Sequence, residues 1–158
     1  MKNTKRFSVK IWIDGSSITN PGPGGWAAVL VSNGKARLLG GHVQMATNNQ
    51  METKALEEAL RALKTPCDVT LYTDSQYVIL GVHKLLLGQF PNTNLEFWKG
   101  AHQVIGLHMI KIEKTRAHET DPWNNLVDMV AYQCASLSLD YNELYEDAQE
   151  LLAKSRKR

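Results

Sequence analysis

Four acidic residues occupy positions where acidic side chains are unusual, and they are the strongest chemical signal in the sequence. Asp14 and Asp74 each follow a run of strand-forming residues, IWI and VTLYT. Glu52 borders the apolar stripe of a predicted helix, and Asp128 stands among apolar residues of another. Any one of them could be a turn residue, a helix cap or a surface acid. Together, on four separate elements, they predict a functional cluster.

A cluster of carboxylates repels itself unless a cation is bound within it. Oxygen ligands suit Mg²⁺ or Mn²⁺ better than zinc. Because Mg²⁺ keeps several waters and takes substrate phosphates as further ligands, the four acids indicate chemistry at a phosphate.

The elements that would position these acids follow from the periodicity of apolar residues. Alternation and turn signals predict strands over 7–14, 26–31, 36–43, 69–73 and 108–115, with a glycine- and proline-rich turn after the first and Asn-Gly at the second hairpin. Helical spacing predicts helices over 47–63, 75–87, 95–105, 124–137 and 141–153. Strands that alternate with helices after an initial meander predict an α/β fold with a mixed sheet covered by helices. If the first and fourth strands are neighbours, Asp14 and Asp74 lie side by side.

The composition is that of an ordinary globular protein, with 158 residues of which 43% are hydrophobic and 22% charged. No apolar run is long enough for a membrane helix or a signal peptide, so we expect a cytoplasmic, monomeric protein without a membrane partner. Cys67 and Cys134 lack a partner motif and are expected to be reduced. The formal net charge is +2, but four basic residues lie within 154–158, so the remaining body has 14 basic against 16 acidic residues. Charge alone therefore predicts no nucleic-acid partner, although the basic tail is a weak hint.

Four ordered motifs resemble type 1 ribonuclease H, and the resemblance spans residues 7–137. They are DGS at 14–16 with NPGPGG at 20–25, TNNQME at 47–52, TDSQY at 73–77, and RAH at 116–118 followed by Asn124 and Asp128. The resemblance implies a ribonuclease H-like fold with a five-stranded mixed sheet. It also implies endonucleolytic hydrolysis of the RNA strand of an RNA–DNA hybrid. The whole chain, 1–158, would be one ribonuclease H domain, with a core at 7–137 and a C-terminal helix and basic tail at 138–158.

The same resemblance assigns roles to individual residues. Asp14, Glu52, Asp74 and Asp128 would be catalytic carboxylates that bind two Mg²⁺ ions, with Mn²⁺ as the other candidate. His118 would assist proton transfer or product release. Contacts to the hybrid would come from Asn20, Thr47, Asn48 and Gln76, although turn, cap or surface chemistry could also explain these four.

Two features depart from the family pattern. The long basic protrusion of well-known bacterial members is missing, because 81–106 is short and contains only Lys84 and Lys99 as permanent cations. An Arg common two residues before Thr47 is replaced by Met45. We therefore expect modest substrate affinity unless basic residues at the two ends of the chain compensate.

The alternative from a different class is a non-catalytic hybrid-binding module that has kept the ribonuclease H fold. Proofreading exonucleases and transposases of related fold arrange their acids differently and fit the sequence less well. The C-terminal helix could pack on its own sheet or serve in dimerisation, with the former the simpler interpretation.

Overall fold

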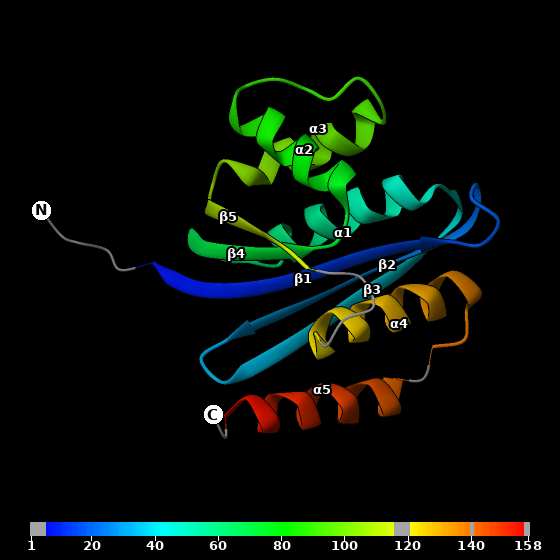
Figure 1. The fold of residues 1–158 in the computed structure, drawn as a ribbon, viewed down its shortest axis with the longest axis vertical. Coiled ribbons are helices and arrows are strands. Elements are labelled where there is room, and N and C mark those ends of the chain that lie inside the picture. Colours follow the sequence, from blue (N-terminus) through cyan, green and yellow to red (C-terminus); the bar gives the residue numbers. More distant parts are fainter. Residues whose placement is uncertain (1–5, 116–120, 140, 157–158) are drawn as a thin grey trace, which may run out of the picture.

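A five-stranded mixed sheet forms the centre of the structure, as predicted, and its strand order is β3-β2-β1-β4-β5 (Figure 1). This computed structural model describes residues 6–115, 121–139 and 141–156. β1 pairs antiparallel with β2 and parallel with β4, while β2–β3 is antiparallel and β4–β5 parallel. The strands are β1 (Phe7–Ser17), β2 (Gly22–Ser32), β3 (Lys35–Ala46), β4 (Cys67–Thr73) and β5 (Met109–Lys114).

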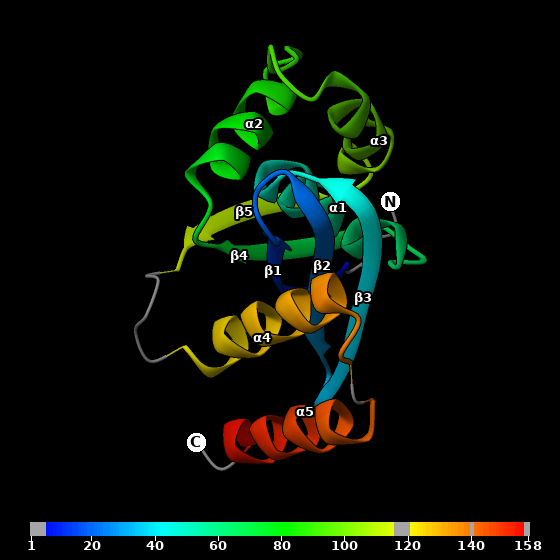
Figure 2. The same ribbon diagram turned by 90° about the vertical axis from the view of Figure 1, so that its right-hand side faces the viewer.

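Helices cover both faces of the sheet (Figures 1 and 2). α1 (Asn48–Arg61) packs on one face, and α2 (Gln76–Leu86) and α3 (Leu95–Ile105) lie beyond it on the same side. α4 (Pro122–Ser136) packs on the other face, and α5 (Tyr141–Arg156) lies against β3 and α4. No helix among the described residues is both long and apolar enough to cross a membrane.

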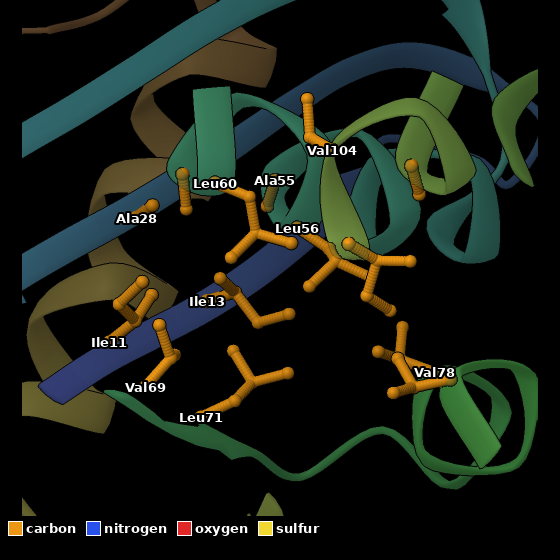
Figure 3. Close-up of a cluster of buried hydrophobic side chains, with 14 of the residues drawn as sticks. Ile11, Ile13, Ala28, Ala55, Leu56, Leu60, Val69, Leu71, Val78 and Val104 are labelled. Atoms are coloured by element: carbon orange, nitrogen blue, oxygen red, sulfur yellow. The ribbon is translucent and has the colours of Figure 1, made fainter. Parts of the chain in front are cut away.

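The alternation along β1 divides its side chains between two cores. Ile11 and Ile13 are fully buried on the α1 face, in a cluster that also includes Leu56 of α1 and Leu71 of β4 (Figure 3). Trp12 points to the opposite face and joins the α4 cluster. Since successive side chains of a strand point to opposite faces, Asp14 lies on the same face as Trp12.

Local signals placed most helices correctly. Thr47 caps α1 in a capping box with Gln50, and the Ser75 hydroxyl accepts from Val78 N at the start of α2, as expected. α3 has the predicted bounds. α4 begins at Pro122, two residues before the predicted start, because Asp121 is its cap and proline fits the first helical turn.

The prediction that the first strand ends at Asp14 is wrong. β1 continues to Ser17 and β2 begins at Gly22, and Ser17 pairs with Gly24. Most of the glycines predicted to form a turn therefore lie in strand β2 of the β1–β2 hairpin. The glycines are needed there for close packing: a Cβ atom at Gly25 would overlap the backbone of α4 at Ala131 and Ala135.

Three further expectations are confirmed. Cys67 and Cys134 are buried free thiols. Trp98 is fully buried and therefore serves as a core residue. α5 packs on its own sheet, with Leu152 buried in the α4 cluster.

Candidate active site

Asp14 is a buried carboxylate on the central strand of the sheet. Its side chain is only 6% exposed, and its Oδ1 accepts a hydrogen bond from Gly15 N at 2.8 Å. Burial is the largest cause that raises the pKa of Asp14 to about 9, followed by the charge of Asp74 and a hydrogen bond with Asp128. An isolated buried carboxylate is costly, so this position requires a specific reason.

Asp74 reaches Asp14 because their strands are neighbours. β1 and β4 run parallel with Trp12 opposite Tyr72, and Asp74 follows β4 directly. The expectation that the two strands are neighbours is confirmed, and Asp74 is close enough for its charge to raise the pKa of Asp14. Asp74 is half-buried and also raises the pKa of Glu52.

Glu52 approaches the same place from α1, on the opposite face of the sheet from α4. The side chain is half-buried, and its Oε2 atom is buried without a hydrogen-bond partner. Burial is the largest cause that raises the pKa of Glu52 to about 7. A hydrogen bond from Ser75 acts in the opposite direction and lowers this pKa. A buried carboxylate oxygen that lacks a partner indicates a missing ligand at this point.

Asp128 completes the cluster, but its surroundings differ from those expected. The sequence places it among apolar residues, yet the structure leaves its side chain exposed. Its neighbours Leu126 and Val127 belong to the buried face of α4. Asp128 lies outside that face, within hydrogen-bonding reach of Asp14. The premise that Asp128 is a buried acid is therefore wrong, although it does meet the other acids.

The four acids fit a divalent cation bound partly through water. They come from four different elements, and the main charged causes of the raised pKa values of Asp14 and Glu52 are other carboxylates. Within the described residues, no three His, Cys, Asp or Glu side chains are arranged to hold an ion by themselves. Mg²⁺ suits such a site because it uses one or two carboxylates and completes its shell with waters and substrate phosphates.

The other predicted site residues have mixed outcomes. His118 lies outside the described residues. Asn20 and Asn48 form one chain of hydrogen bonds, in which Asn20 Oδ1 accepts from Asn48 N at 3.0 Å and Asn48 Oδ1 accepts from Ser17 N at 2.7 Å. Thr47 caps α1. These three residues thus have turn and cap roles whatever else they do.

Gln76, the first residue of α2, is exposed and lies next to the end of β5. Its Oε1 accepts a hydrogen bond from Lys114 Nζ at 3.4 Å. Gln76 follows Asp74 by two residues, and its side chain is open to solvent.

Sequence reasoning missed two contacts that anchor α4. Trp12 Nε1 donates to Asp121 Oδ2 at 2.9 Å, and the Thr115 hydroxyl donates to Asn124 Oδ1 at 3.2 Å. The Asp-Pro pair at 121–122 is a helix-start signal that could have located the cap. No sequence pattern identifies the tryptophan that binds it.

Comparisons with known proteins point to one family. The model of the family described as RNase H matches residues 6–136. A ribonuclease H of Nitratidesulfovibrio vulgaris (strain Miyazaki F) is 42% identical, with 86% of this chain and 91% of the relative covered. A ribonuclease H of Caldicellulosiruptor saccharolyticus is 38% identical, with 78% and 92% covered.

Solved structures share the fold. A crystal structure of LC9-RNase H1, a type 1 RNase H with the type 2 active-site motif, aligns with a TM-score of 0.75 at 23% identity, covering 89% of this chain and 77% of that one. RNase H1 of the halophilic archaeon Halobacterium salinarum NRC-1 aligns with a TM-score of 0.66 at 28% identity, covering 82% and 98%. LC11-RNase H1, solved in complex with an RNA/DNA hybrid, aligns with a TM-score of 0.66 at 19% identity, covering 84% and 99%.

Proposed function

The chain belongs to the RNase H family and is a ribonuclease H, and on this premise we propose that it cuts the RNA strand of RNA–DNA hybrids endonucleolytically with the help of two divalent ions. The observation that carries the proposal is the convergence of Asp14, Glu52, Asp74 and Asp128 from four elements onto one end of the central strand. Their presence in a chain that matches the RNase H model over 6–136 makes hydrolysis of a nucleic-acid phosphodiester the natural use of the cluster.

The four carboxylates would hold the ions, and Asp14 would be the central ligand because it is buried on the central strand among the other acids. When bound there, two Mg²⁺ ions would supply Lewis-acid stabilisation of the scissile phosphate and of the leaving 3′ oxygen, and a lowered pKa for the attacking water. Mn²⁺ has the same preference for oxygen ligands and is the other candidate.

Among the described residues, no basic side chain is a cause of the pKa shifts of Asp14 and Glu52. Asp14 and Glu52 have raised pKa values in the absence of an ion, so both tend to hold protons and must release them when a cation binds. The Ser75 side chain keeps Glu52 oriented by a hydrogen bond. We propose that His118 takes up or delivers a proton near the leaving group, because imidazole titrates near neutral pH.

Hybrid recognition is proposed to use the polar residues around the acids. Double-helical RNA is recognised by its shape and 2′-hydroxyl groups, for which amide and hydroxyl side chains are suitable partners. The Asn20 and Asn48 side-chain oxygens already accept backbone hydrogen bonds, so their NH₂ groups are the donors suited to sugar or phosphate oxygens. Thr47 and Gln76 would add contacts beside them. The hybrid complex of the similar LC11-RNase H1 supports this proposal.

The absence of the basic protrusion predicts a weaker hold on the hybrid. Residues 87–94 join α2 to α3 directly (Figure 2). This connection contains no Lys or Arg that could bind a phosphate backbone. Because each phosphate contact contributes both affinity and salt dependence, we propose that binding is modest and only mildly sensitive to salt. The cytoplasmic location and monomeric state expected from the sequence stay predictions.

A cleavage assay tests the proposal. End-labelled RNA–DNA hybrid, single-stranded RNA and duplex DNA are incubated with the protein and with Mg²⁺ or Mn²⁺. We expect internal cuts in the RNA of the hybrid alone. Asp74→Asn should lower the rate by about 10²–10³-fold without loss of folding, because a ligand charge at the site is removed.

Asp68→Asn is the matched control, since Asp68 is an exposed acid at the opposite end of β4. Its rate should equal that of the wild type. Binding of hybrid by the wild type without any cleavage would instead support the non-catalytic module. Full activity of Asp74→Asn would contradict the assigned role of the carboxylates.

A further inference from the structure

A partly buried hydrogen bond joins the strand of Asp14 to the helix of Asp128. Trp12, two residues before Asp14 in β1, donates from Nε1 to Asp121 Oδ2 at 2.9 Å. Asp121 is the cap of α4, and its other oxygen, Oδ1, accepts from Trp123 N and Asn124 N at 3.1 Å each. One carboxylate therefore binds the start of α4 through one oxygen and the central strand through the other.

The direction of the Trp12 N–H group is fixed by aromatic packing. The Trp12 ring is 6% exposed and stacks on Tyr72, with ring centroids 4.5 Å apart and planes 10° apart. Trp123 of α4 packs against the same ring, with centroids 5.6 Å apart. A donor held this firmly defines where Asp121 must lie, and hence where α4 begins.

A second bond ties the same helical turn to the end of β5. Thr115 N donates to Thr73 O at 2.9 Å, and the Thr115 hydroxyl donates to Asn124 Oδ1 at 3.2 Å. Thr115 and Asn124 are 6% and 4% exposed, respectively. The first turn of α4 is thus bound to Thr115, which directly follows β5 and pairs with the last residue of β4, as well as to Trp12 of β1.

The position of the start of α4 also fixes the position of Asp128, because the helix is rigid between them. Asp128 follows Asp121 by seven residues, which is about two turns and about 10 Å along the axis, so both residues lie near the same face. A tilt or rotation at the capped end would therefore move Asp128 relative to Asp14. Displacements of about 1 Å in a catalytic site can cost about 10²-fold in rate.

We propose that Trp12 and Asp121 are positioning residues, whose hydrogen bond holds Asp128 at its working distance from Asp14. This inference rests on the proposed function, because it assigns a purpose to the spacing of two proposed ion ligands. The cap alone does not require the bond, since Oδ1 already accepts from the helix amides.

Two conservative substitutions separate positioning from stability. Asp121→Asn keeps a capping oxygen, and asparagine is a good cap, but it sets an NH₂ group against the Trp12 N–H. Trp12→Phe keeps an aromatic ring beside Tyr72 and Trp123 and removes the donor. Leu152→Ala, on α5 in the same apolar cluster as Trp12, is a control that costs core stability without removing either partner of the Trp12–Asp121 bond or the cap.

Three quantities are measured: the melting temperature, kcat and KM on hybrid, and Mg²⁺ affinity by calorimetry without substrate. We expect each conservative variant to lose about tenfold in kcat with KM within about twofold, and to bind Mg²⁺ more weakly. The double variant should lose about as much as either single one, because both remove the same interaction. Leu152→Ala should melt at a lower temperature with kcat and Mg²⁺ affinity unchanged.

Variants that melt earlier but keep the kcat and Mg²⁺ affinity of the wild type would overturn the inference and leave the bond a purely structural one. A double variant whose kcat loss is the product of the single losses would overturn it as well. If Trp12→Phe does not fold, Asp121→Asn decides the question alone. If the wild type cleaves no hybrid, the proposed function fails, while the Mg²⁺ titration still decides whether the bond sets the spacing of the acids.

Discussion

Gly15 and Glu52 are in backbone contact: a Cβ atom at Gly15 would overlap the backbone nitrogen of Glu52 and the adjacent Met51 carbonyl carbon. The residue after Asp14 therefore determines how closely α1 approaches β1. This close approach brings the Glu52 carboxylate to the end of β1 and β4 where Asp14 and Asp74 lie. The glycine in the DGS motif thus has a packing reason that does not involve a turn.

Gly15→Ala should be destabilising and inactivating. The added methyl group meets backbone atoms that cannot rotate away, so α1 must shift outward. We expect a loss of about 2–4 kcal/mol in the free energy of unfolding, or about 5–10 °C in melting temperature, with hybrid cleavage lost. Thermal melts and the cleavage assay measure both effects. Gly106→Ala is the control: a Cβ atom there has no neighbour within 4 Å, and its stability should stay within about 0.5 kcal/mol of the wild type.

Asp14→Asn should stabilise the protein in the absence of divalent ions, while abolishing cleavage. The pKa of Asp14 is raised from its ordinary value of 3.8 to about 9 by burial and by neighbouring carboxylates. Below about pH 4 the carboxyl group is protonated in both states, and the variant gains nothing. Between about pH 4 and 9 the unfolded chain ionises more readily than the folded one, so the wild type loses stability as the pH rises.

The gain of the variant should therefore grow with pH and reach at least about 1 kcal/mol, or about 2–4 °C, at pH 8. Melting curves in a chelating buffer at pH 5, 6.5 and 8 measure it. A variant that melts below the wild type at pH 8 would show that Asp14 is stabilised as an anion by the protein itself.

Mg²⁺ affinity should rise with pH and be accompanied by proton release. Because Glu52 and Asp14 have pKa values of about 7 and about 9 without an ion, the cation competes with protons on both groups. For each proton released, the affinity should increase about tenfold per pH unit below the relevant pKa. Calorimetry between pH 6 and 9 in buffers of different ionisation enthalpy measures affinity and proton number together. Asp68→Asn should behave as the wild type, and an affinity independent of pH would contradict the role of the protonated pair.

Met45→Arg should tighten hybrid binding. Met45 is 66% exposed in β3, two residues before the Thr47 cap and close in sequence to the proposed substrate contacts. A new cation there would add about one phosphate contact, which steepens the dependence of log affinity on log salt by about 0.9 and lowers KM several-fold. Binding to a non-cleaved hybrid at several salt concentrations measures the slope. Met45→Gln is the uncharged control and should leave it unchanged.

Local chemistry explains which parts of the fold could be predicted. Thr47 and Ser75 act through hydrogen bonds within three residues of themselves, so the starts of α1 and α2 were visible in the sequence. The meeting of Asp14 and Asp74 was conditional on the first and fourth strands being neighbours, and β1 and β4 do pair, in parallel. The meeting of these two acids was thus predictable once their strands are neighbours, whereas the acids of α1 and α4 reach the same place from inside their helices.

The errors arise where distant backbone decides the outcome. Gly24 and Gly25 look like turn residues, but a Cβ atom at Gly24 would meet side chains of β3 and α1, and one at Gly25 would overlap the backbone of α4, so only glycine fits in the strand. The exposure of Asp128 depends on the rotation of α4 about its own axis, which helical spacing alone fixes only roughly. The Trp12–Asp121 bond depends on that same rotation and on the crossing of α4 over β1. None of these relationships has a signature in a short stretch of sequence.

The position of α5 has a consequence for biosynthesis. This helix follows α4 in the chain, yet its buried Ala148 and Leu152 belong to a cluster against which side chains of the edge strand β3, such as Leu38, are packed. During translation the sheet and α4 are complete before α5 leaves the ribosome, so for that interval the apolar face at β3 is covered by α4 alone. We expect the nascent chain to be most prone to self-association, and most dependent on chaperones, in this short period.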